Sequence, residues 1–122
     1  MNRPGRTPID TTRLLLLLLT VAGISTGQIL FKFAAQTLPP RPQVWDIALN
    51  YYTIAAIILY AALTFLWVFL LKGGDLNKTY PVMSLSFVLV PAASWVVFGE
   101  TLGRANVLGL ILIVVGVVLV MR

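Results

Sequence analysis

Four long apolar runs dominate this sequence and constrain its fold more than any other feature. They cover residues 14–35, 52–71, 79–98 and 105–121. Each is close to the ~20 residues that an α-helix needs to cross about 30 Å of hydrocarbon. Inside a bilayer every backbone N–H and C=O group needs a partner within the protein, and a helix supplies these partners by itself. We therefore predict an all-α membrane protein, a bundle of four transmembrane helices.

The composition agrees with this prediction. The chain of 122 residues is 59% hydrophobic and 11% charged, whereas soluble proteins contain about 45–50% apolar and about 25% charged residues. The segments between the runs are rich in Pro, Gly, Asn and charged residues, as expected of turns. Because they leave no space for a soluble domain, we expect residues 1–122 to form a single integral membrane domain.

The residue types that are missing exclude several kinds of chemistry. The chain contains no Cys and no His, so a disulfide, a thiolate nucleophile and an imidazole base are all excluded. We expect no metal site, no cofactor and no enzymatic activity. The basic pI of about 10.1 reflects membrane topology and attraction to lipids, so we do not expect nucleic-acid binding.

The first apolar run has one alternative interpretation. Arginines precede the segment LLLLLLTVAGIS, and this combination is also typical of a secretory signal. However, the run continues through Phe33, well beyond the ~7–15 residues of a signal's apolar core. We therefore expect a first helix that is retained.

Lys and Arg residues beside the helix ends predict the orientation. Four crossings place both termini on one side, together with the connection between the second and third helices. Basic residues accumulate on the cytoplasmic side, so we expect cytoplasmic termini and a single direction of insertion. The basic residues on that side are Arg3, Arg6, Arg13, Lys72, Lys78 and Arg122, against Arg41 and Arg104 on the other, with Lys32 near its edge.

Two polar side chains in the first helix are candidates for ligand binding. Lys32 lies 18 residues after Leu14, or about 27 Å along a helix, which places it near the extracytoplasmic boundary. An ammonium group there, with the amide of Gln28 one turn deeper, suits a phosphate or sugar headgroup. Two alternatives stay open: Lys32 extends its stem to the interface, and Gln28 binds a neighbouring helix.

The third helix carries a stripe of residues at steps of four, three, four and three, so they share one face. This face either lines a cavity or packs against other helices. We also expect Pro91 to kink the helix in mid-membrane and to free the carbonyl of Phe87. The stripe consists of Tyr80, Ser84, Phe87, Pro91 and Ser94.

Two further features lie toward the C-terminus. Glu100 is in the tight connection before the fourth helix, where it either orders an outer gate, is solvated, or pairs with a neighbour such as Arg104. Gly109 and Gly116 lie seven residues apart, on nearly one face of the fourth helix, and would allow close approach of another helix. That helix belongs either to the same chain or to a partner subunit.

The segments LNKTYPVMSLSFVLV and GETLGRANVLGLILIVVGV resemble the drug/metabolite transporter superfamily, which includes the EamA-like proteins. Within it the chain is most similar to the short four-helix subunits of the aminoarabinose-phospho-undecaprenol flippase. Those subunits carry a Gly-Gln pair and a following Lys in the first helix, matched by Gly27, Gln28 and Lys32, and a Tyr-Pro at the head of the third. The other matching positions are Leu76, Tyr80, Pro81, Ser84, Phe87, Gly99, Glu100, Leu102, Gly109, Leu112, Ile113 and Gly116.

This resemblance implies a subunit that moves a polyprenyl-phosphate-linked sugar or a related lipid across the bacterial inner membrane. It also implies a homodimer, or a heterodimer with another small four-helix subunit. Our hypothesis for the site is that Gln28, Tyr80 and Ser84 line the path, Lys32 compensates the phosphate, and Glu100 orders the outer gate. In the same hypothesis the dimer contacts are Gly109 and Gly116.

The chain also resembles, more distantly, the small multidrug resistance exporters, in its length and in Gly27 and Lys32. Those exporters couple to protons through a membrane-embedded Glu four positions before that Gly, a place that falls near Gly23 or Ile24 in this chain. The first helix contains no carboxylate, which argues against export of drug cations by their mechanism. Two alternatives remain: an exporter of small solutes with another coupling residue, and a non-transporting membrane partner of a lipid-sugar enzyme.

Overall fold

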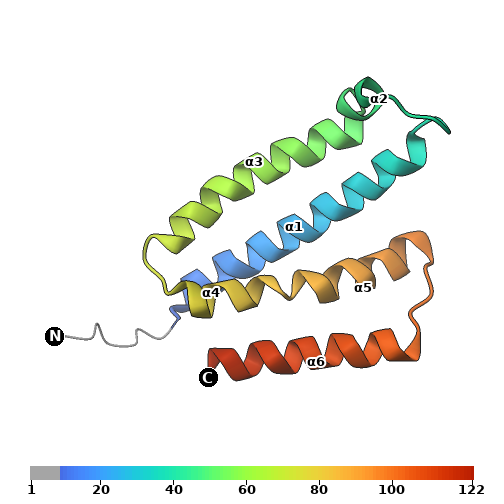
Figure 1. Ribbon diagram of the computed structural model, residues 1–122. Helices are drawn as coiled ribbons and strands as arrows, with labels where there is room; N and C mark the ends of the chain where they lie inside the picture. The colour runs from blue at the N-terminus through green and yellow to red at the C-terminus, as the bar shows by residue number, and fades with distance from the viewer. Residues whose placement is uncertain (1–8) are drawn as a thin grey trace.

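The computed structural model describes residues 9–122, and all regular structure in this part of the chain is helical (Figure 1). Four stretches are long and apolar enough to cross a membrane: α1, α3, α4 together with α5, and α6. The predicted fold class is therefore confirmed. The helices are α1 (Thr11–Thr37), α2 (Val44–Ala48), α3 (Tyr51–Leu71), α4 (Leu76–Met83), α5 (Ser86–Phe98) and α6 (Arg104–Met121).

The spanning helices pack side by side in the order α3, α1, α4 with α5, and α6 (Figure 1). α1 has the most extensive contacts, since it packs against α3 on one side and against α4 and α5 on the other. The extensive contacts of α6 are with α4 and α5. α1 is therefore the central helix of the bundle.

The core joins α1 to its neighbours at the end of the molecule where α3 ends and α4 begins. Leu17 and Val21 of α1 are fully buried there against Leu70 of α3 and Val82 of α4. The buried hydroxyl of Thr20 donates a hydrogen bond to the carbonyl of the preceding turn of α1. Such a bond satisfies the hydroxyl without a partner from another helix.

Glycines allow the close approach of α1 and α3. A Cβ atom at Gly27 would lie 2.7 Å from a ring carbon of Tyr60, and one at Gly23 would lie 2.8 Å from Leu63. Lipid tails are as apolar as leucine, so tight van der Waals contact is a main source of helix association in a membrane. The two glycines thus explain why α1 pairs with α3.

The third span is interrupted between α4 and α5. The amides of Ser84 and Leu85 donate to the carbonyls of Pro81 and Val82, three residues earlier, at 3.0 and 3.1 Å. The Ser84 hydroxyl also donates to the Pro81 carbonyl, at 2.6 Å. These hydrogen bonds span three residues instead of four, so they tighten the backbone and end the α-helical pattern. This break was not anticipated from the sequence, and α5 continues through Pro91, where the kink stays a prediction.

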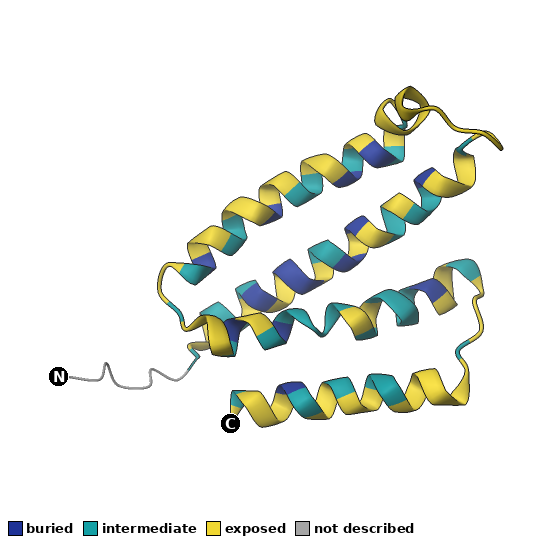
Figure 2. Ribbon diagram, in the orientation of Figure 1, coloured by how far each residue is buried: buried dark blue, intermediate teal, exposed yellow. Residues whose placement is uncertain are grey.

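α6 leaves most of its surface open (Figure 2). Val117 is the buried residue of this helix, and its long apolar side chains are largely exposed. A Cβ atom built at Gly109 or Gly116 would meet nothing within 4 Å. The described part of the chain therefore places no other helix against these glycines, and a contact within the same chain is not observed.

We predict that Gly27→Val destabilises the pairing of α1 with α3, because the new side chain overlaps the ring of Tyr60. Overpacking of this kind costs about 1–3 kcal/mol. The measurement is equilibrium unfolding in mixed micelles. Ala22→Val, at an exposed position of the same helix, is the matched control and should change stability little. Equal stabilities of the two variants would contradict the close contact.

Candidate functional site

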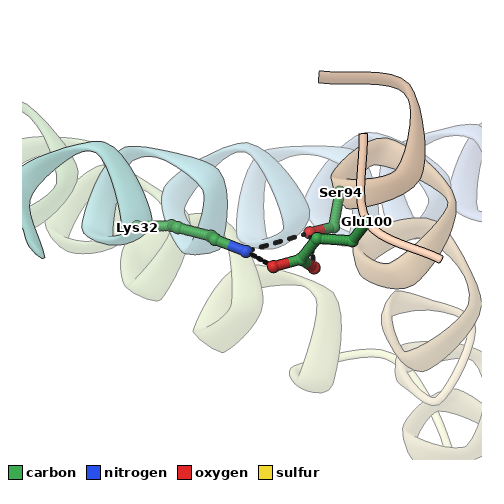
Figure 3. A network of polar contacts seen from close by, with 3 residues as sticks. All are labelled: Lys32, Ser94 and Glu100. Carbon is green, nitrogen blue, oxygen red and sulfur yellow. Dashed lines mark hydrogen bonds and ion pairs between the residues drawn. The ribbon is translucent and has the colours of Figure 1, made fainter. Parts of the chain in front are cut away.

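Three polar side chains meet at the end of α1 that lies near the α5–α6 connection (Figure 3). The ammonium of Lys32 forms an ion pair with Glu100 and also contacts the Ser94 hydroxyl oxygen, at 3.4 Å. The Ser94 hydroxyl donates a hydrogen bond to the second carboxylate oxygen of Glu100. The partner of Glu100 is therefore Lys32, whereas the sequence suggested solvent or Arg104.

The surroundings of this network differ from residue to residue. Ser94 is only 7% exposed, whereas the side chains of Lys32 and Glu100 are 32% and 52% exposed. The Lys32 nitrogen lies 4.6 Å from the centroid of the Phe98 ring, close enough for a cation–π interaction. The Lys32 ammonium therefore has specific partners within the protein at this end of the helices. A lysine that only extended its stem to the membrane interface would not need them.

Gln28 connects α1 to α3. Its amide nitrogen donates to the hydroxyl of Tyr60 at 2.9 Å, and that hydroxyl donates to the carbonyl of Ile24 at 3.2 Å. The Phe31 ring stacks on the Tyr60 ring, with centroids 5.6 Å apart. The interhelical hydrogen bond considered for Gln28 is therefore present.

A cavity of about 390 Å³ lies between α1, α3, α4 and α5. Four aromatic side chains contribute to its wall, and the rings of Trp67 and Tyr80 meet edge to face with centroids 6.4 Å apart. Four Ser and Thr side chains also line it, and none of its lining residues is charged. The lining consists of Thr20, Ile24, Tyr60, Leu63, Thr64, Trp67, Tyr80, Met83, Ser84, Ser86 and Phe87.

The residues predicted for the site fall into two groups. Tyr80 and Ser84 both line the cavity, whereas Lys32 and Glu100 pair with each other outside it. Gln28 does not line the cavity, but it binds Tyr60, which does. The predicted stripe on the third span also divides, because Phe87 lines the cavity while Ser94 contacts Lys32.

The sequence reasoning missed Tyr60, Trp67 and the role of Ser94. Tyr60 is a hydroxyl-bearing aromatic residue within an aliphatic stretch of the second run, IAAIILYAAL. Such a residue in hydrocarbon needs a hydrogen-bond partner, and this requirement was the available signal. The choice of Gln28 as that partner depends on how α1 and α3 face each other.

Arg13 has a structural role at the opposite end of α1. Its guanidinium donates to the carbonyls of Leu70 and Gly73, where α3 ends. The last carbonyls of a helix lack partners within the helix, and a cation there also interacts favourably with the negative end of the helix dipole. Arg13 therefore fixes the start of α1 against the end of α3.

These features define a small multi-pass membrane protein with a neutral cavity between its helices and a paired lysine at one end. Transport proteins commonly place polar groups from several helices around such a cavity. The sequence agrees, because the model of the EamA-like transporter family matches residues 5–122. The chain belongs to the EamA-like transporter family.

Curated relatives extend this comparison, and the three described next share the name "Probable 4-amino-4-deoxy-L-arabinose-phosphoundecaprenol flippase subunit ArnE". The protein of Aeromonas hydrophila is 34% identical over 107 residues, which cover 87% of this chain and 94% of that protein. The protein of Enterobacter sp. is 29% identical over 76% of this chain and 81% of its own length. The protein of Pseudomonas aeruginosa strain UCBPP-PA14 is 45% identical over 46% of this chain and 49% of its own length. No solved structure matches the chain.

We predict that Gln28→Leu and Tyr60→Phe are energetically coupled, since each removes one side of the same hydrogen bond. Interhelical hydrogen bonds in membranes contribute about 0.6 kcal/mol on average. A double-mutant cycle on unfolding in mixed micelles should return a coupling of about this size. Gln28→Leu combined with Tyr52→Phe, which alters another tyrosine of α3, should be additive. Additivity in the Gln28 and Tyr60 cycle would contradict the contact.

Proposed function

We propose that this chain is a subunit of a transporter that moves a polyprenyl-phosphate-linked sugar, or a related lipid, between the leaflets of the bacterial inner membrane. The observation that carries the proposal is the chemistry of the polar groups: a lysine at one end of the helices and a neutral, hydroxyl-lined cavity between them. The names of the relatives support the same class of ligand.

The two groups of residues suit the two parts of such a headgroup. The phosphodiester carries a negative charge, which the ammonium of Lys32 compensates. The sugar ring has an apolar C–H face, which suits the aromatic rings of Trp67 and Tyr80, and hydroxyls, which suit a polar side chain such as Ser84. At about 390 Å³ the cavity is within the range of small-ligand sites, about 300–1,000 Å³. The polyprenyl chain remains among the membrane lipids.

Assembly with a second subunit is part of the proposal. The open surface of α6, with Gly109 and Gly116 unopposed in the described chain, supports a contact with another four-helix subunit or a second copy. Close approach at glycines is a common way for membrane helices to associate. Alternating access then follows if one subunit rocks against the other around the cavity.

Cytoplasmic termini belong to the same proposal. The start of α1, the α3–α4 connection and the end of α6 lie at the same end of the molecule (Figure 1). That end carries Arg13, Lys72, Lys78 and Arg122, which supports a cytoplasmic location for it. Arg3 and Arg6, which add to the predicted bias, lie outside the described residues.

The alternative exporter of small solutes has less support. Drug-cation antiport needs a carboxylate embedded in the membrane, and the part of α1 within residues 14–35 contains none. Glu100 follows α5 and its charge is compensated by Lys32. The other alternative is a non-transporting partner of a lipid-sugar enzyme, and the transport experiment below distinguishes it from a transporter.

We predict that the reconstituted protein, with itself or a second small subunit, exposes a polyprenyl-phosphate-linked sugar to an impermeant oxidant added outside the liposomes. Lys32→Met should slow this exposure about 10-fold or more, because a hydrogen bond to a charged group contributes about 1.5–3 kcal/mol. Lys72→Met, at an exposed position of the opposite end, is the control and should leave the rate nearly unchanged.

Two outcomes of this assay would contradict the proposal at different points. Unchanged exposure with every subunit combination, despite correct insertion, would remove the transport function and favour the non-transporting partner. Wild-type rates in Lys32→Met would leave transport intact and remove Lys32 from the ligand site.

A further inference from the structure

The carboxylate of Glu100 occupies the position that an anionic ligand of Lys32 needs. Donors from two helices converge on it: the ammonium of Lys32 from α1 and the hydroxyl of Ser94 from α5 (Figure 3). Ser94 is 7% exposed and belongs to a helix, so its hydroxyl is held in place between the ammonium and the carboxylate. Glu100 is half exposed and belongs to the connection after α5.

We propose that Lys32 and Ser94 form a binding site for the phosphate of the lipid ligand, and that Glu100 is an internal substitute which the phosphate displaces. This inference rests on the proposed function, since it concerns the same ligand. It goes further in assigning Ser94 to the site and in making Glu100 a competitor of the ligand.

The charges and donors favour such an exchange. A carboxylate and a phosphodiester each carry one negative charge, so the replacement leaves the net charge around Lys32 unchanged. Each also presents two oxygens, which can accept from the ammonium and from the hydroxyl of Ser94. The displaced carboxylate lies at an exposed position and regains water, and an ion pair this exposed is weak enough to exchange.

The exchange has a structural consequence for the α5–α6 connection, residues 99–103. The ion pair of Glu100 with Lys32 ties this connection to α1. The connection begins at Gly99, whose φ of 67° lies in the left-handed region that favours glycine. Displacement of Glu100 removes the tie, so residues 99–103 separate from α1 when the ligand binds.

The first test is binding of an undecaprenyl-phosphate-linked hexose to the protein in nanodiscs of phosphatidylethanolamine and phosphatidylglycerol. Undecaprenol, which lacks the phosphate, and free inorganic phosphate are the reference ligands. Glu100→Gln removes the competing charge and keeps the size of the side chain, so affinity should rise by about threefold or more. Lys32→Met should weaken binding about 10-fold or more, and Ser94→Ala by a smaller factor, since each removes a donor.

The double variant with Lys32→Met and Glu100→Gln should bind as weakly as Lys32→Met alone, because the competitor matters only when Lys32 is present. Asp46→Asn removes another negative charge at the same end of the molecule and should not change the affinity. An equal rise in Asp46→Asn and Glu100→Gln, or no rise in Glu100→Gln, would overturn the competition.

A second measurement leaves Lys32, Ser94 and Glu100 unchanged. The chain has no Cys, so spin labels at Gln36→Cys and Thr101→Cys, both exposed, report the distance between α1 and the connection. The lipid-linked hexose should lengthen this distance, and undecaprenol should not. A distance unchanged in the ligand-bound protein would overturn the displacement. Failure of the wild-type protein to bind the hexose lipid would instead remove the proposed ligand, and this inference with it.

Discussion

The high cost of an unpaired polar group in hydrocarbon is the constraint on which this structure depends. It makes the four spans helical, and it governs the polar side chains within them. Thr20 satisfies its hydroxyl on its own helix, whereas Gln28 needs Tyr60 of α3. Lys32 obtains its counter-ion from the connection after α5. Polar pairing therefore joins α1 to both of its neighbours, in addition to the close packing at Gly23 and Gly27.

The central position of α1 unites the cavity and the lysine network. One part of α1 contributes Thr20 and Ile24 to the cavity wall, and a later part presents Lys32 to Ser94 and Glu100. The two regions are joined through Gln28, whose partner Tyr60 also lines the cavity. In the proposed function, α1 therefore contributes to both parts of the site, the phosphate at Lys32 and the sugar about two turns earlier along the helix. The open α6 leaves a surface for a second subunit.

The sequence was sufficient for the fold class and for the four spans, because run length and backbone satisfaction decide both. It also identified Lys32, Glu100, Tyr80 and Ser84 as polar residues in a membrane setting. It could not pair them, since the partner of Lys32 depends on packing between elements more than 60 residues apart in the chain. It also did not reveal the break between α4 and α5, which depends on the backbone and hydroxyl bonds at Ser84.

The proposed ligand places its phosphate at Lys32 and its sugar in the cavity between the helices. The most direct measurement is photo-crosslinking with a polyprenyl-phosphate-linked sugar that carries a diazirine next to the phosphate, followed by peptide mapping of the labelled residues. Labels should concentrate on the end of α1 around Lys32 and on the part of α5 around Ser94. Labels confined to the exposed surfaces of α3 and α6, as for a bulk membrane lipid, would contradict the claim.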